Sequence, residues 1–298
     1  MQFVCILISA PDQAAVNSEV RTLAAESLGT PDDWRCLSPE TAYEINFSMP
    51  GTTAFEAEDL VRAALGSRQV DVAMVPAENR RKKLLVADMD STMIEQECID
   101  ELADAVGVKE QVSAVTERAM RGEIAFEPAI RERVALLEGL DRTTLQSVME
   151  TRISFTPGGK KLVRTMRAHG AKTALVSGGF TLFTGFVAGE LAFDSHHANI
   201  LEFDDEKLAG TVREPILGRE AKLETMRRIE GEHGIAPVET LSLGDGANDL
   251  AIIEAAGLGV AFRAKPALEA AADVRIRHGD LTSVLYIQGY AESEFAAV

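Results

Sequence analysis

The chain lacks most features that mark secreted or membrane-spanning proteins. It has three cysteines, Cys5, Cys36 and Cys98, in no repeated spacing. An odd, irregular set argues against a disulfide framework or a zinc site and favours free thiols in a reducing cytosol. No stretch approaches the roughly 20 apolar residues of a membrane span. The apolar start, MQFVCILISA, has no basic segment before it, so it is a poor secretory signal. We therefore expect a cytoplasmic protein without a membrane partner.

Positive charge is also scarce. The 30 lysines and arginines are outnumbered by 47 acidic residues, which gives a net charge of −17. This excess disfavours nucleic acid and anionic membranes as partners. It would also oppose a phosphate ester. A site for such a substrate must therefore rely on local cations: a metal ion, a few basic side chains and helix N-termini.

The length of 298 residues, 46% of them hydrophobic, suits two domains with a sizeable core. In the first eighty residues, periodicity predicts strands at 2–9, 42–48 and 70–75 and helices at 12–26 and 55–65. This is an α+β sandwich pattern. The charged run at 79–83 is interpreted as a solvated linker. We therefore expect domains at 1–80 and 81–298.

The second domain has the pattern of an α/β protein. A short apolar strand at 84–87 is followed by a helical stretch over 94–149, with glycine breaks at 107, 122 and 139. Strands then alternate with helices: strands at 171–176, 240–243 and 258–262, helices at 180–191, 219–231 and 249–255, and a hairpin of 198–203 with 207–212. Such alternation predicts a parallel sheet, whose ligands bind beyond the carboxyl ends of the strands.

The first polar cluster, Asp88-Met89-Asp90-Ser91-Thr92, follows the apolar strand directly. Two aspartates there would be costly without a counter-cation, and Mg²⁺ with oxygen ligands supplies one. One carboxylate can attack phosphorus while the other protonates the leaving oxygen. The same residues also fit an ordinary capped turn between a strand and a helix.

Two further elements have the chemistry of a phosphate site. Ser177-Gly178-Gly179 follows a strand and places a hydroxyl and close-approaching backbone N–H groups at a helix start. Lys222 can neutralise a phosphate and a nucleophile as a point charge. Taken singly, the first also fits a flexible N-cap turn, and the second fits a solvated surface lysine.

The last cluster follows the predicted strand at 240–243 and contains Gly244, Asp245, Gly246, Asn248 and Asp249. Asp245 can complete the metal site that Asp88 and Asp90 begin. Asn248 can donate to the phosphate, and Asp249 can orient Lys222 or a metal-bound water. The alternative is an Asx turn that caps the next helix.

Together these motifs, DxDxT, SGG, Lys and GDGxND in this order, resemble the haloacid dehalogenase superfamily over residues 84–290, and within it the phosphoserine phosphatases. The resemblance implies a Rossmann-like parallel sheet with a small four-helix cap at 95–153. It implies Asp88 as nucleophile and Asp90 as general acid and base. It implies Mg²⁺ held by the Asp88 carboxylate, the Asp90 backbone carbonyl and Asp245. It implies that the phosphate is held by Ser177, Gly178 and Lys222, with Asn248 close by. Met89 departs from the phenylalanine that is frequent in the family.

The cap carries the residues that the resemblance assigns to the substrate. Phosphoserine offers an ammonium, which Glu97 can accept, and a carboxylate, which Arg133 can bind bidentately. Phe126 can pack over the ligand and exclude water. In isolation, Glu97 and Arg133 would equally fit solvated helix faces.

The N-terminal domain resembles a ferredoxin-like, ACT-type regulatory domain by pattern and position, and either an amino-acid ligand or a homodimer contact suits it. The expected activity is hydrolysis of the small molecule O-phospho-L-serine, the last step of serine synthesis. A phosphotransferase with the same nucleophile is the first alternative. A catalytically inert amino-acid sensor is the second alternative. It predicts a damaged catalytic set, whereas Asp88, Asp90, Lys222 and Asp245 are all present.

Overall fold

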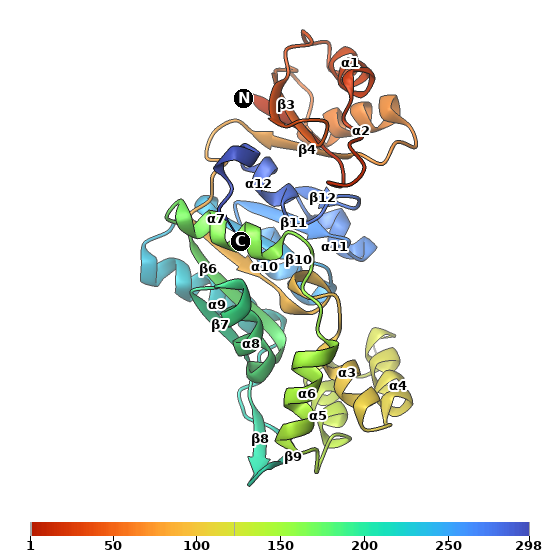
Figure 1. Cartoon of the computed structure of the whole chain (residues 1–298), viewed down its shortest axis with the longest axis vertical. Coiled ribbons are helices and arrows are strands. Elements are labelled where there is room, and N and C mark those ends of the chain that lie inside the picture. The colour runs from red at the N-terminus through yellow and green to blue at the C-terminus, as the bar shows by residue number, and fades with distance from the viewer. Residues whose placement is uncertain (1, 122, 298) are drawn as a thin grey trace.

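The computed structural model describes residues 2–121 and 123–297. These form a four-stranded sheet, a six-stranded sheet, a two-stranded hairpin and a helical insert (Figure 1). The predicted α/β fold with a parallel central sheet is confirmed. The break predicted at Gly122 lies outside the described residues. Among those residues, no helix is both long and apolar enough to cross a membrane.

The N-terminal unit, as we call the elements from β1 to β4, follows a β-α-β-β-α-β order. Its sheet has the strand order β2-β3-β1-β4, with neighbouring strands antiparallel. Its elements are β1 (Phe3–Ile8), α1 (Ser18–Ser27), β2 (Arg35–Ser38), β3 (Ala42–Phe47), α2 (Ala54–Leu65) and β4 (Asp71–Pro76). The helix predicted from residue 12 starts later, because Asn17 caps it by accepting a hydrogen bond from the Val20 N–H.

The first sheet is buried on both faces. Along β1, Cys5 and Leu7 pack in a core with α1 and α2, whereas Val4, Ile6 and Ile8 belong to the large core of the rest of the chain. Side chains alternate between the faces of a strand, so both faces need apolar residues. This explains the unbroken run FVCILI.

The large sheet holds six parallel strands in the order β12-β11-β10-β5-β6-β7. They are β5 (Leu84–Ala87), β6 (Lys172–Phe180), β7 (Ser195–Asn199), β10 (Thr240–Gly244), β11 (Leu258–Phe262) and β12 (Val274–Ile276). From β5 the chain adds β6 and β7 on one side and β10 to β12 on the other. This reversal makes the carboxyl end of β5 a switch point, where ligands of such sheets bind.

Helices cover both faces of this sheet. One face packs against α9 (Arg219–His233) and α10 (Leu250–Ala255), and the other against α7 (Gly159–Ala168), α8 (Thr181–Leu191) and α12 (Ser283–Ile287). In β5, Leu84 and Val86 face the first layer while Leu85 and Ala87 face the second. The short helix α11 (Pro266–Ala271) lies between β11 and β12.

A helical insert leaves the sheet after β5 and returns before α7 (Figure 1). It contains α3 (Cys98–Ala105), α4 (Lys109–Met120), α5 (Phe126–Ala135) and α6 (Arg142–Arg152). A hairpin of β8 (Leu201–Asp204) and β9 (Lys207–Val212) packs against it, and backbone hydrogen bonds join Gly139 and Leu140 to Leu208.

The strand predicted at 198–203 is wrong in its limits. Residues 195–199 form β7 at the edge of the large sheet, and the hairpin begins only at Leu201. The sequence of β7, SHHAN, is polar because an edge strand is partly solvated, so it gave no periodic apolar signal.

The segment 79–83 connects the two sheets, as expected of a linker, but the prediction that it is solvated is wrong for Arg80 and Lys82. The guanidinium of Arg80 bonds the Glu44 carboxylate at 2.7 Å and the backbone oxygen of Ile287 at 3.1 Å. Lys82 is 7% exposed, and its ammonium donates to the backbone oxygens of Val238 and Gly257. The basic run therefore fastens the N-terminal unit to the parallel-sheet unit. Charge alone could not reveal partners that are distant in sequence.

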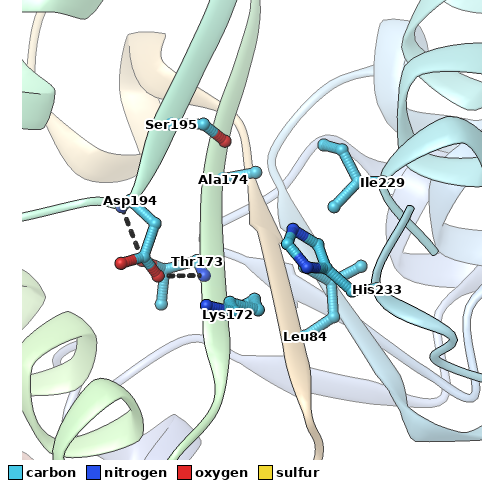
Figure 2. A pocket seen from close by; sticks show the side chains of 8 residues that line it. All are labelled: Leu84, Lys172, Thr173, Ala174, Asp194, Ser195, Ile229 and His233. Atoms are coloured by element: carbon cyan, nitrogen blue, oxygen red, sulfur yellow. Dashed lines mark hydrogen bonds between the residues drawn. The ribbon is translucent and has the colours of Figure 1, made fainter. Parts of the chain in front are cut away.

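The described residues line a cavity of about 240 Å³ at the amino ends of β5 and β6 (Figure 2). It includes Leu84, Lys172 and His233. Leu84 begins the strand that Asp88 follows, so this cavity lies at the opposite end of the sheet from the predicted chemistry.

Asp71 offers a test of how the two units are joined. Its buried carboxylate accepts hydrogen bonds from the backbone N–H groups of Arg277, His278 and Gly279. Asp71→Ala leaves these donors unpaired, so we expect it to lower the free energy of unfolding by about 3 kcal/mol. Asp59→Ala, at an exposed position on α2, is the control. Equal urea midpoints for the two variants would contradict this role.

Candidate active site

The first site residue, Asp88, lies directly after β5, and both of its carboxylate oxygens are held. Oδ1 accepts the Met89 N–H at 2.8 Å and lies 2.9 Å from the Lys222 ammonium. Oδ2 accepts the Asn248 amide at 2.9 Å. The residue is 3% exposed. The side chain predicted as nucleophile is thus fixed in orientation by groups from three separate elements.

A tight turn over Met89–Met93 carries the second aspartate. Asp90 Oδ1 accepts the Cys98 N–H at 3.0 Å, which ties the turn to the start of α3. A Cβ atom on Gly179 would lie 2.9 Å from Asp90 Oδ2. A side chain there would displace the carboxylate, so glycine is required for Asp90 to approach the β6 end.

The Ser177-Gly178-Gly179 segment lies at the end of β6, the strand beside β5. Ser177 is 1% exposed, and its hydroxyl oxygen accepts the Gly179 N–H at 2.9 Å. The backbone oxygen of Gly178 accepts the side-chain amide of Asn199 at 2.8 Å. The segment is therefore held in a defined shape next to Asp90, as a phosphate cradle requires.

Lys222, in the first turn of α9, points into the protein and not into solvent. Its ammonium lies 2.7 Å from Asp249 and 2.9 Å from Asp88, and its side chain is 1% exposed. The reading of Lys222 as a solvated surface lysine is therefore wrong. Asp249 accepts a hydrogen bond from this ammonium, which fits the first of the two roles suggested for it, the other being to orient a metal-bound water. Asn248 was predicted to donate to the phosphate; in the structure its amide bonds the Asp88 carboxylate.

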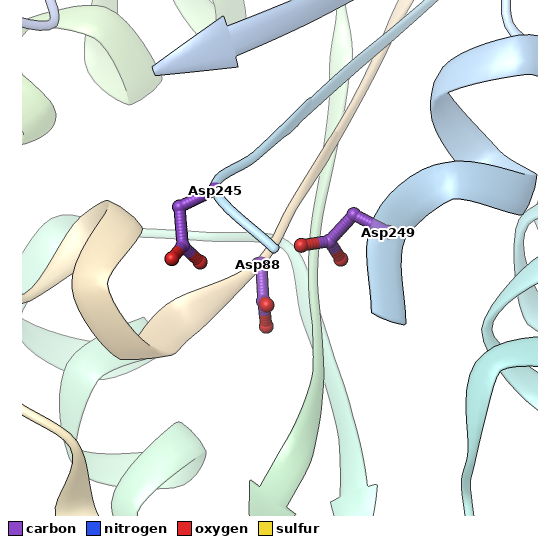
Figure 3. A group of neighbouring side chains, drawn as sticks. All are labelled: Asp88, Asp245 and Asp249. Atoms are coloured by element: carbon purple, nitrogen blue, oxygen red, sulfur yellow. The ribbon is translucent and has the colours of Figure 1, made fainter. Parts of the chain in front are cut away.

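Three buried carboxylates, from Asp88, Asp245 and Asp249, converge beyond the ends of β5 and β10 (Figure 3). One oxygen of each lies within 4.8 Å of the others. The buried ammonium of Lys222 contacts two of them. The remaining negative charge and the all-oxygen donor set fit a hard divalent cation. Asp90 is not part of this carboxylate group; its predicted ligand atom is the backbone carbonyl.

The helical insert brings Glu97 and Phe126 to the same region. The Ser91 hydroxyl donates to Glu97 Oε1 at 2.8 Å, which links Glu97 to the turn after β5. The Phe126 ring lies against Gly178 and Gly218, where added Cβ atoms would approach it to 3.2 and 3.3 Å. Arg133 is partly buried, and its Nε donates to the Ala129 carbonyl at 3.3 Å.

Two residues near the site were not predicted. Asn199 bonds Gly178 and both polar backbone groups of Leu217, so it joins the phosphate segment to the approach of α9. Its strand was misplaced in the prediction. The Lys265 ammonium lies 3.8 Å from Asp245 Oδ2 and is more than half exposed. Lys265 follows β11 closely, at the same sheet edge as Asp245, and this position in the sequence could have predicted its place near the site.

This geometry agrees with comparisons to known proteins. The haloacid dehalogenase-like hydrolase family matches residues 85–254, which contain Asp88, Ser177, Lys222 and Asp245. The chain belongs to the haloacid dehalogenase-like hydrolase family. It is 44% identical over 217 residues to a phosphoserine phosphatase of Archaeoglobus fulgidus. That match covers 72% of this chain and 63% of the relative, so the chain spans less than two thirds of the relative's length.

Solved structures extend the likeness. A haloacid dehalogenase family hydrolase of Salmonella enterica serovar Typhi superimposes with a TM-score of 0.86 at 27% identity, over 98% of this chain and 99% of that one. The likeness thus includes the N-terminal unit. A phospho-aspartyl intermediate analogue of a phosphoserine phosphatase matches 69% of this chain and 98% of its own, with 38% identity and a TM-score of 0.65.

Burial and neighbouring charges shift the pKa values of Asp90 and Lys222 in this hydrolase. Burial, followed by the charge of Glu97, raises the pKa of Asp90 to about 7. Burial opposes charge on Lys222, but Asp249 and Asp88 outweigh it and raise the lysine pKa. Lys222 therefore stays protonated beside Asp88, while Asp90 can hold or release a proton near neutrality. This is the division of roles that a nucleophile and a general acid need.

Asp90→Asn tests the raised pKa. Because the folded pKa of about 7 exceeds the ordinary 3.8, proton-linked stability is full below 3.8 and is lost as the pH rises through 7. The neutral asparagine should therefore raise the melting temperature of the metal-free protein at pH 8 much more than at pH 5. Asp59→Asn, at an exposed site, should show no such difference. The proposal for Asp90 fails if the asparagine shifts the melting temperature equally at both pH values.

Proposed function

We propose that this chain is a phosphoserine phosphatase, which hydrolyses O-phospho-L-serine to serine and phosphate. One observation carries the proposal: Asp88, at the switch point of the sheet, is held by Lys222 and Asn248 beside the half-buried carboxyl of Asp90. The relationship to named phosphoserine phosphatases supports the substrate.

The reaction needs two steps. The Asp88 carboxylate attacks phosphorus to form an aspartyl-phosphate, and Asp90 gives its proton to the departing serine oxygen. Asp90, now ionised, accepts a proton from water as the water attacks the aspartyl-phosphate. Serine and then phosphate leave, and Asp88 and Asp90 return to their starting states.

The phosphate is held by Ser177, Gly178 and Lys222. The Lys222 ammonium already lies between Asp88 and Asp249, so it lowers the repulsion between the nucleophile and an anionic phosphate without moving. Asn248 fixes the second oxygen of Asp88 and lies close to the phosphate. Preorganised charge of this kind costs no reordering during the reaction.

Mg²⁺ is the cofactor that fits the carboxylate group. Asp88 and Asp245 would hold it by their carboxylates and Asp90 by its backbone carbonyl, with Asp249 beside them. When bound, the ion supplies positive charge that offsets the phosphate oxygens and the crowded carboxylates.

The helical insert, residues 95–153, acts as the cap of the site and selects the substrate. Glu97 takes the serine ammonium, Arg133 takes the carboxylate, and Phe126 covers the ligand. The acidic field at Glu97 supports the first role: the side chain faces solvent on one side, yet burial and the charge of Asp88 raise its pKa. A positively charged amino group would offset the negative charge around Glu97.

The N-terminal unit, in a domain of residues 1–80 ahead of the catalytic domain of 81–298, has the strand and helix order of an ACT-type regulatory domain. An amino-acid ligand and a homodimer contact remain predictions for it. The intact catalytic set disfavours the inert sensor as an alternative for the whole chain.

A panel of small phosphomonoesters with Mg²⁺, scored by released phosphate, tests the reaction. We expect phosphoserine to give the highest kcat/KM and phosphate release to match serine release with or without added alcohols. Transfer of phosphate to an added alcohol in preference to water would favour the phosphotransferase. Higher kcat/KM with an ester that lacks an amino group would contradict the substrate.

Glu97→Gln tests recognition of the ammonium. The variant keeps the size of the side chain but loses its charge, so we expect KM for phosphoserine to rise about tenfold. KM for an aryl phosphate without an amino group should change little. Glu95→Gln, at an exposed neighbouring position, is the control. An equal rise for both substrates would remove Glu97 from substrate recognition.

A further inference from the structure

A basic pocket lies where the N-terminal unit meets the parallel-sheet unit, away from the active site. It has a volume of about 260 Å³. Its walls come from the end of α2, the turn that leads to β4, and the segment after β12. The residues that line it are Arg62, Leu65, Gly66, Ser67, Arg68, Val70, Val72, Arg277 and His278.

The lining departs from the charge of the whole molecule. The chain has 47 acidic and 30 basic residues, yet the described residues that line this pocket include three arginines and no carboxylate. The carboxylates that pair with these arginines, on Glu58, Glu19 and Glu269, are not part of the wall. The described residues of the wall therefore carry basic side chains without acidic ones among them.

The guanidinium groups are already held in place. Arg62 bonds Glu58 and the Val72 carbonyl, and Arg68 bonds Glu19 and the Leu65 carbonyl. Arg277 makes both of its bonds to Glu269. Each arginine thus uses two of its five N–H donors in these bonds. A ligand that met the others would bind ordered groups, which lowers the entropic cost of binding.

The pocket is shared between the two units. Arg62 and Arg68 belong to the N-terminal unit, whereas Arg277 and His278 follow β12. The same segment after β12 is fixed to β4 by the bonds that its backbone donates to Asp71. A ligand held by both sets of side chains would strengthen this junction.

We propose that this pocket binds a small oxyanion with at least two negative charges, such as phosphate or a tricarboxylate, and that the anion fastens the N-terminal unit to the catalytic domain. Planar guanidinium groups bind phosphate and carboxylate oxygens in a bidentate manner, which matches this ligand class. The site is separate from the proposed phosphatase chemistry and does not depend on it.

Calorimetric titration of the full chain, in EDTA, with inorganic phosphate and with citrate tests the site. Arg68→Gln combined with Arg277→Gln should weaken binding of at least one anion about tenfold or more, since each change removes a charged donor. Arg121→Gln combined with Arg228→Gln is the matched control, because both are exposed, ion-paired arginines outside the pocket. This control should bind like the unaltered chain.

The two anions distinguish the sources of the ligand. If the pocket variant loses affinity for phosphate alone, the ligand is a tetrahedral anion. If it loses affinity for citrate alone, the ligand is a carboxylate. Hydrogen exchange should slow at residues 66–68 and 277–279 when the anion is added. Binding of phosphate at the active site would be unchanged in both double variants. Arg68→Gln alone provides the same comparison if the double variant fails to fold.

The proposal is overturned if neither anion binds the unaltered chain at millimolar concentration. It is also overturned if the pocket variant and the control bind both anions equally.

Discussion

The buried ammonium of Lys222 is the group on which the active site depends. It lies 2.9 Å from Asp88 and 2.7 Å from Asp249. Without it, the three buried carboxylates, whose oxygens lie within 4.8 Å of one another, would keep as a positive neighbour among the described residues only the largely exposed Lys265 ammonium, 3.8 Å from Asp245. Burial of like charges is costly, so the carboxylates would become protonated or open the fold.

The parallel sheet explains how these groups come together. β5, β6 and β10 are neighbours, and their carboxyl ends deliver Asp88, Ser177 and Asp245 to one edge. The helical insert leaves from that edge. Glu97, near its start, therefore lies close enough to accept a hydrogen bond from the Ser91 hydroxyl. The N-terminal unit contacts the edge strand β12 and the helix α12 of the parallel-sheet unit, and it contributes no residue to the carboxylate group.

The active-site residues could be predicted from the sequence more completely than the contacts that join the two units. The strand LLVA and the polar turn after it were predictable from the residues, because two aspartates at a strand end need a counter-cation. Lys222 was assigned only through the resemblance of the ordered motifs, since a lone helical lysine also fits a solvated surface, and its burial was not predicted. The roles of Arg80 and Lys82 were not predictable, because their partners, Glu44 and Val238, are distant in sequence. Asn199 was missed because the polar edge strand that carries it has no apolar alternation.

The central claim is that Asp88 forms a covalent bond to phosphorus. Its most direct test is a rapid acid quench of the enzyme during turnover of phosphoserine, followed by borohydride reduction and peptide mass spectrometry. An aspartyl-phosphate is an acyl phosphate, so reduction should convert Asp88, and no other aspartate, into homoserine. The Asp88→Asn variant should show neither turnover nor conversion. Conversion of another residue, or undiminished turnover by the Asp88→Asn variant, would contradict the account.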